Sequence, residues 1–464
     1  MENKTIKKIC SLLKRRKLYA WKLNINDLVR NNAYFTKHLE KETMLKSNRQ
    51  NIIVTIYKDL GKDIGESSFS VIEFDEEKVD KMIDDALFIC DYSTKPKFSL
   101  PTKPTKSSLS ILAKKTKTVK LIDHGILNPL KHFSNIYKEI KKELSLHKNI
   151  KANNLEMHAS YSRSQIINSN GIDFSEEKTS FYIELTITAN KIINHEIKEQ
   201  EFVAMKECAG FSKLKPKEFV KKNIEIVNHV LNSESSCTFN GNVMLSGGAI
   251  SEFFAPHLSL NPLIMHASAK IKHMKLSRYH KEKKIADFKQ DKLTISSNPF
   301  VPLNHASGMF DGDGVLSAKL KLIDGGIFKN YFTNKQYADY LNIEPTGVFG
   351  CVDISGGKKT MKEISQNIPY VEIISFSSFV PNSISGDFSA EIRLGYIVEE
   401  DKGYKHNQNK QIKIIKKPFK GGMFTGNVFQ LVENMLLSKE RKEETGYIGS
   451  KIVMFGKGVV SGMD

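Results

Sequence analysis

Glu252 and His257 are the residues of this sequence that come nearest to a catalytic metal motif. They lie in the stretch GGAISEFFAPHLS (247–259), directly after the apolar run NVML (242–245). A zinc peptidase helix carries two His one turn apart, which bind the ion, and a Glu that serves as general base. Here one His follows the Glu, and Pro256 stands between them. The stretch is therefore a metal-binding helix, a degenerate one, or an ordinary strand-to-helix turn.

Two other patterns imitate ligand sites, and in each the ligand set is incomplete. His195-Glu196 begins like an HExxH motif, but Glu199 stands where the second His is required. We expect an exposed pair at the end of a strand or the start of a helix. The segment MFDGDGV (309–315) resembles part of a calcium loop, yet it lacks the distal bidentate Glu. It is better explained as a tight turn between strands.

Four histidines at intervals of nine, seven and seven form a further pattern: His257, His266, His273 and His280. Spacing by sevens can place side chains on one face of a helix. No carboxylate or Cys partner lies at metal spacing, so the pattern favours a basic helix face over a metal site. The sequence holds no P-loop, GxGxxG or GxSxG motif.

Length and composition indicate a globular protein of two domains. The chain has 464 residues, of which 40% are hydrophobic and 26% charged. No apolar run approaches the roughly 20 residues of a membrane span, and no small-residue cleavage site follows the basic N-terminus. We therefore expect a cytoplasmic protein without a signal peptide. The five cysteines lie far apart without a CxxC pair, which predicts reduced thiols: Cys10, Cys90, Cys208, Cys237 and Cys351.

The net charge of +18 raises the question of nucleic-acid binding. Lysines gather in residues 95–120, 269–292 and 402–420. Arg, which forms bidentate contacts with phosphate and guanine, is scarce in comparison. A bias to Lys along the whole chain favours a solvated surface, so we expect no membrane partner and regard nucleic acid as unlikely.

Periodicity predicts an α+β half followed by a β-rich half. Helical spacing of apolar residues predicts helices over 1–20, 74–90, 131–147 and 217–231, while alternation predicts strands within 21–60 and 155–189. Residues 92–120 are rich in Pro, Lys, Ser and Thr and predict a loop. From about 238 the chain becomes rich in Gly and strands, with a hairpin around Asp324-Gly325-Gly326. We place the domains at 1–235 and 236–464.

Several segments in this order resemble the TldD/PmbA family, whose members are named both as modulators of DNA gyrase and as peptide-maturation proteases. The segments are FDGDGVLSAKLKLIDGGIFKNYFTNKQYADYLNIEPTG (310–347), SISGDFSAEIRLGYIVEEDKG (383–403), KPFKGGMFTGNVFQLVENM (417–435) and, in the N-terminal half, INSNGIDFSEEKTSFYIELTITA (167–189). The resemblance implies an N-terminal α+β domain, a barrel-like C-terminal β domain, and dimers around a central cavity. It also implies a choice between two branches. The TldD branch holds a metal with an HExxxH helix and a C-terminal Cys, and the PmbA branch, also called TldE, lacks these ligands.

The resemblance places the motif's first His at Ser251, its Glu at Glu252 and its second His at Pro256. His257 is one position late, which on a helix is a rotation of about 100°. A proline inside a helix costs about 3 kcal/mol. The segment TGYIGSKIVMFGKGVVSGMD (445–464) contains no Cys, whereas a catalytic zinc requires three protein ligands. Glu252 remains the one weak catalytic candidate, and Glu252 and His257 remain weak metal candidates.

We therefore interpret the chain as a PmbA/TldE-like subunit of a metal-dependent peptidase system for peptide maturation or degradation. We expect no cofactor in this chain and zinc in a TldD-like partner. The expected partners are a second copy or a TldD-like subunit, with an unfolded peptide as substrate. Two alternatives stay open: a self-sufficient metallopeptidase with a degenerate site that uses Glu252 and His257, and a DNA- or gyrase-associated binding protein.

Overall fold

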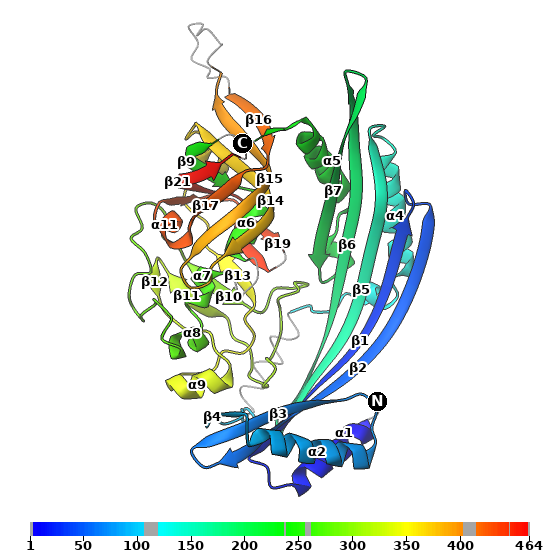
Figure 1. Cartoon of the computed structure of the whole chain (residues 1–464), viewed down its shortest axis with the longest axis vertical. Coiled ribbons are helices and arrows are strands. Elements are labelled where there is room, and N and C mark those ends of the chain that lie inside the picture. The colour runs from blue at the N-terminus through cyan, green and yellow to red at the C-terminus, as the bar shows by residue number, and fades with distance from the viewer. Residues whose placement is uncertain are drawn as a thin grey trace.

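The structure is a computed structural model that describes residues 3–105, 119–235, 238–255, 261–401, 414–444 and 446–462. A long curved sheet with helices at its two ends stands beside a rounder, β-rich half (Figure 1). Helices and strands are mixed in the first half, and a closed barrel lies in the second. The predicted α+β fold class with a barrel-like C-terminal domain is confirmed.

One antiparallel sheet of seven strands forms the N-terminal half, in the order β4-β3-β2-β1-β5-β6-β7. The strands are β1 (Ala20–Thr36), β2 (Lys41–Leu60), β3 (Asp63–Val71), β4 (Thr94–Pro96), β5 (Ile150–Asn168), β6 (Asp173–Ile193) and β7 (Glu196–Cys208). Within the described residues β7 pairs only with β6, so its other edge is open. His195-Glu196 lies at the β6–β7 turn, where His195 has a φ of 68°. It is a strand-end pair.

Two pairs of helices cover the two ends of this sheet (Figure 1). They are α1 (Asn3–Arg15) with α2 (Glu76–Cys90), and α4 (Leu130–Leu144) with α5 (Pro216–Asn232). In α2, Asp75 caps the first turn by accepting a hydrogen bond of 2.9 Å from the Lys78 amide. The helix then buries Val79, Ile83 and Ala86 against the sheet. The apolar residues that recur with helical spacing in the sequence are therefore the ones that the helix buries.

Five strands of the C-terminal half close into a barrel. They are β9 (Phe239–Leu245), β14 (Tyr370–Pro381), β15 (Asp387–Glu400), β17 (Met423–Asn427) and β21 (Val453–Ser461). The ring runs β14-β9-β21-β17-β15 and returns to β14, with β14 and β9 parallel and the other pairs antiparallel. Closure leaves no open edge in the ring, and aromatic side chains such as Phe376, Phe388 and Phe424 fill it. Three short strands extend this sheet: β8 (Glu234–Ser235), β16 (Ile414–Lys420) and β18 (Met435–Leu437).

A second sheet of six short strands packs beside the barrel. It contains β10 (Ile295–Asn298), β11 (Leu320–Asp324), β12 (Ile327–Phe328), β13 (Cys351–Ile354), β19 (Arg441–Glu444) and β20 (Tyr447–Ser450). Short helices connect the strands: α6 (Ala249–Phe254), α7 (Pro262–Met265), α8 (Ala269–His273), α9 (Lys335–Leu341), α10 (Met361–Ile364) and α11 (Val428–Glu433). The hairpin predicted around Gly325-Gly326 is confirmed: β11 pairs with β12, and both glycines have positive φ.

The prediction that four histidines share one helix face is wrong. Helices α7 and α8 have four and five residues, and His280 lies in the loop that follows them. His266 is buried in the core, with its Nε2 atom 2.8 Å from the Ile384 carbonyl oxygen. Helix α7 ends at Met265 and α8 begins at Ala269, so the repeat by sevens runs across a break between two short helices. His257 lies outside the described residues.

The two halves are joined at both ends of the sheet. At one end Lys22 of β1 forms a 2.5 Å ion pair with Asp313, and Ser99 donates to Asp339 of α9. At the other end the Lys420 ammonium of β16 donates to Gln200 of β7 at 2.8 Å. The segment 309–315 is a tight turn, as predicted, and it contains the Asp313 that pairs with Lys22. No helix in the described parts of the chain is long and apolar enough to span a membrane.

Replacing Phe253 by Ala tests the packing of the barrel core. This ring is 1% exposed and lies against Phe388 and Phe455. We expect the cavity to lower the free energy of unfolding by about 3–5 kcal/mol, measured by circular dichroism in urea. The control is Phe88→Ala, because that ring is 64% exposed and its loss should cost about 0.5 kcal/mol or less. Equal losses in the two variants would contradict the assigned core.

Candidate functional site

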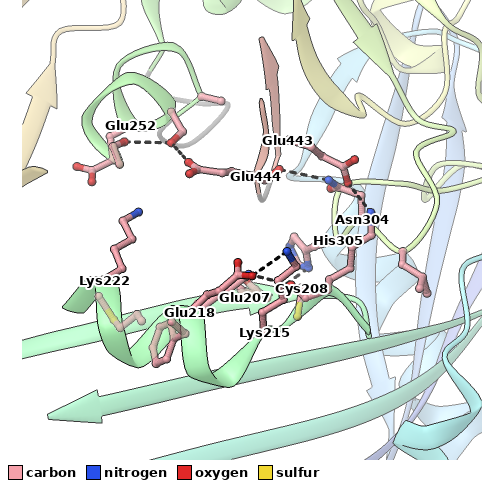
Figure 2. Close-up of a pocket in the computed structure, with 18 of the residues that line it drawn as sticks. Glu207, Cys208, Lys215, Glu218, Lys222, Glu252, Asn304, His305, Glu443 and Glu444 are labelled. Atoms are coloured by element: carbon pink, nitrogen blue, oxygen red, sulfur yellow. Dashed lines mark hydrogen bonds and ion pairs between the residues drawn. The ribbon is translucent and has the colours of Figure 1, made fainter. Parts of the chain in front are cut away.

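A cleft of about 620 Å³ lies between the N-terminal sheet and the barrel half. One wall comes from β7 and α5, and the other from α6, β19 and the loop at 303–305 (Figure 2). Charged side chains from both walls face it: Glu207, Lys215, Glu218, Lys222, Glu252, His305, Glu443 and Glu444. The cleft therefore gathers acids and bases that are distant in the sequence.

Helix α6 brings the weak candidate Glu252 to this cleft. Strand β9 ends at Leu245, and Gly247 then turns the chain with a φ of 53°. A side chain on Gly247 would meet the Ile374 carbonyl oxygen at 2.8 Å, so the turn requires glycine. The apolar face of α6 packs into the barrel core through Phe253 and Phe254, which leaves the polar face toward the cleft. In its described part, 247–255, the stretch is a strand-to-helix turn that places the Glu252 carboxylate on the side of α6 that faces the cleft.

The Glu252 carboxyl is held in a poorly solvated position. Burial raises its pKa to about 7 from the usual 4.5, while the nearby charge of Arg393 opposes the shift and that of Glu444 adds to it. No hydrogen bond to the carboxylate is found among the described residues. The Lys222 ammonium projects from α5 toward it across the cleft (Figure 2). Glu252 can therefore gain or lose a proton near neutral pH, as a general acid or base must.

Ser251, where the resemblance expects the first His, serves a different purpose. Its hydroxyl donates a hydrogen bond to the Glu444 carboxylate of β19. Glu444 is also paired with the Lys442 ammonium at 2.9 Å, and burial lowers the pKa of Lys442. These contacts fix β19 against α6 and fill the side of Glu252 that faces the barrel half.

The opposite wall contributes further ion pairs. His305 Nδ1 lies 3.4 Å from Glu207, and Lys213 bridges to Glu443 at 3.0 Å. The Cys208 thiol is buried, and burial raises its pKa, so it is a poor nucleophile. None of these partners was predicted, because ion pairs that join β7 to the loop at 303–305, and Lys213 to β19, leave no periodic signal in the sequence.

The residues of α6 do not fit a catalytic zinc. The helix ends at Phe254, and Ala255 follows with a φ of −140°. Both Pro256 and His257 lie outside the described residues. In the described part of the chain, no group of three His, Cys, Asp or Glu side chains is arranged to hold a metal ion. The donor at position 251 is a hydroxyl engaged by Glu444, and zinc prefers His, Cys and carboxylate donors.

Comparison with known proteins gives one family and several similar folds. Residues 242–462 match the model of the PmbA/TldA metallopeptidase C-terminal domain. An uncharacterised protein of Methanocaldococcus jannaschii is 24% identical over 309 residues, which is 63% of this chain and 66%, just under two thirds, of the relative.

Solved structures extend the likeness to both halves of the chain. TldE from Thermococcus kodakarensis has a TM-score of 0.71 at 19% identity, covering 99% of this chain and 100% of that one. A protein named as a candidate modulator of DNA gyrase from Bacteroides thetaiotaomicron has a TM-score of 0.76 at 15% identity, covering 99% and 98%. One of the same description from Thermotoga maritima has a TM-score of 0.74 at 16% identity, covering 99% of each chain. At these identities the likeness concerns the fold.

Glu252→Gln should stabilise the fold at neutral and alkaline pH. Below pH 4.5 the carboxyl carries its proton in both the folded and the unfolded chain, so Gln changes little. Between pH 4.5 and about 7 the unfolded chain loses the proton first, and the wild-type fold loses stability as the pH rises. We expect the free energy of unfolding of the variant to exceed that of the wild type by about 2–3 kcal/mol at about pH 8 and by near zero at about pH 4.

The control is Glu218→Gln in the same cleft, whose side chain is 70% exposed. Unfolding free energies of the three proteins across this pH range give the comparison. A difference between Glu252→Gln and the wild type that stays constant with pH would contradict the environment assigned to Glu252.

Proposed function

Its C-terminal domain makes this chain a member of the TldD/PmbA family, and from that premise we propose that it is the TldE-like subunit of a peptide-cleaving system. In this role the chain binds and orients an unfolded peptide. A TldD-like partner chain supplies the metal-dependent chemistry. The partner assembles with this chain, and a second copy of this chain is the other assembly that the proposal allows.

The observation that carries this proposal is the state of α6. The helix holds the position of the family's metal motif after strand β9, and it keeps the Glu as Glu252. Its neighbour Ser251 is a hydroxyl bound to Glu444. A zinc peptidase needs three protein ligands and one open position, and the described side chains around α6 do not provide them. The proposal rests on a cleft whose described side chains include Glu252 but no complete zinc ligand set.

The open edge of β7 supports a peptide ligand. This strand lines the cleft from Met205 to Cys208, and its unpaired edge offers backbone donors and acceptors. An extended peptide can add to such an edge, and its backbone hydrogen bonds do not depend on its side chains. The ring of described barrel strands offers no such edge, because it closes on itself. The proposed role of the chain is therefore sequence-tolerant holding of an unfolded segment.

Within this role Glu252 acts on the peptide in the cleft. Its pKa of about 7 allows it to accept a hydrogen bond or donate one at neutral pH. The charges of Arg393 and Lys442 favour the carboxylate form, and the Lys222 ammonium on the facing wall points toward it (Figure 2). Glu252 can thereby position a peptide amide without a metal.

The first experiment measures the zinc content of the chain purified without chelators, by elemental mass spectrometry. We expect far less than one zinc per chain, because the described residues offer no complete ligand set. We also expect no peptidase activity from the chain alone and activity when a TldD-like chain is added. The control is the TldD-like chain alone under the same conditions.

Nearly one zinc per chain, lost in Glu252→Gln together with peptidase activity, would contradict the proposal. That result would favour a self-sufficient metallopeptidase that uses Glu252 and His257. Salt-sensitive binding of DNA, lost when lysines of residues 269–292 are neutralised, would favour the DNA-associated alternative.

A further inference from the structure

A second cavity of about 530 Å³ lies nearer the start of β7, between this strand and the outer face of the barrel. Strand β7 lines it from Gln200 to Val203, before the strand reaches the cleft that holds Glu252. Two cations project into this cavity from the barrel side, Arg393 of β15 and Lys420 of β16. One unpaired strand edge therefore passes first this cavity with its two cations and then the cleft that holds Glu252.

Arg393 stands at the boundary between the two cavities. Side chains of β15 alternate, so Ile392 and Leu394 enter the core while Arg393 points outward and is half-buried. Its guanidinium lies over the Phe202 ring, 5.6 Å from the ring centroid, and its charge reaches Glu252. No ion pair or hydrogen bond engages the guanidinium among the described residues. Its five N–H donors are therefore free for a ligand.

Lys420 is a second cation whose surroundings favour an anion. Its ammonium donates to the neutral amide oxygen of Gln200, and no carboxylate of the described chain pairs with it. Burial and the nearby charge of Lys198 lower its pKa. A negatively charged group placed here would relieve both costs.

Two acids, Glu201 and Glu391, also line this cavity, and neither forms an ion pair with Arg393 or Lys420 in the described chain. Glu201 accepts a hydrogen bond of 2.7 Å from Asn153. Glu391 lies on the same outer face of β15, two residues from Arg393, and forms no ion pair in the described chain. The lining thus holds two cations and two acids, and what distinguishes Arg393 and Lys420 is that neither forms an ion pair with a carboxylate of the described chain.

We propose that this end of the cleft binds a carboxylate of the peptide, with Arg393 as its bidentate partner and Lys420 as the second cation. A planar guanidinium matches the two oxygens of a carboxylate, and partial burial strengthens the contact. The carboxylate belongs to the peptide's C-terminus or to an acidic side chain, and β7 aligns the adjoining residues with Glu252. This inference rests on the proposed peptide-binding function.

The test uses fluorescence anisotropy with the full chain and three fluorescein-labelled peptides of ten Ser and Ala residues. The first has a free C-terminal carboxylate, the second a C-terminal amide, and the third a C-terminal amide preceded by one Glu. We expect the free carboxylate to lower Kd at least about tenfold relative to the amide. The third peptide identifies the source of the carboxylate. If its Kd is near that of the first peptide, the site accepts an acidic side chain as well as a C-terminus.

Arg393→Gln should remove the difference in Kd between the carboxylate and amide peptides. Arg393→Lys should keep only part of it, because Lys lacks the paired N–H donors of a guanidinium. Lys420→Gln should reduce it severalfold and provides a second variant if Arg393→Gln does not fold. Lys289→Gln is the matched control, because it removes the same charge from an exposed position in the lysine-rich segment. Circular dichroism melting verifies the fold of each variant.

Equal affinity for the carboxylate and amide peptides would overturn the inference and leave the peptide-binding function intact. A difference that survives Arg393→Gln would likewise overturn it. Failure to bind any of the three peptides would remove the proposed function and the inference together. Displacement of the first peptide by a single-stranded oligonucleotide, in an Arg393-dependent way, would assign the site to phosphate and overturn the inference.

Discussion

The candidate site depends on the burial of one short apolar helix face. Helix α6 has six residues, too few to be stable by itself, so its formation relies on packing. Phe253 and Phe254 are each 1% exposed inside the barrel half, and burying such a ring contributes roughly 1.5–3 kcal/mol. Because these rings fix the rotation of the helix, they also determine that Ser251 meets β19 and that Glu252 faces β7. The core thereby specifies the polar side of the cleft.

The electrostatics of the cleft differ from those of the chain as a whole. The sequence carries a net charge of +18, yet five glutamates face the cleft beside His305 and a few lysines: Glu207, Glu218, Glu252, Glu443 and Glu444. Most of these acids are paired, whereas Glu252 is separated from water and from close partners. The neighbouring cavity differs in that its two cations, Arg393 and Lys420, form no ion pair with a carboxylate of the described chain. Folding therefore gathers paired acids in the cleft and unpaired cations in the cavity next to it.

Sequence patterns predicted elements well and contacts poorly. Helix α2 could be read from Val79, Ile83 and Ala86 because one face of it is buried against a sheet. The barrel was expected only from a resemblance, since closure depends on pairings such as β14 with β9 that periodicity cannot specify. Glu252 was found from its place after an apolar strand. Its neighbour Glu444, which binds a residue 193 positions away, left no signal.

The junctions at both ends of the long sheet constrain how anything reaches the cleft. Lys22 with Asp313 joins the halves at one end, and Lys420 with Gln200 joins them at the other. Two bodies joined at both ends cannot swing apart about one hinge as a jaw does. Under the proposed peptide-binding function, attachment at both ends would favour a loose chain end over a compact domain. The two junctions would then select a ligand by whether it is unfolded, independently of its side chains.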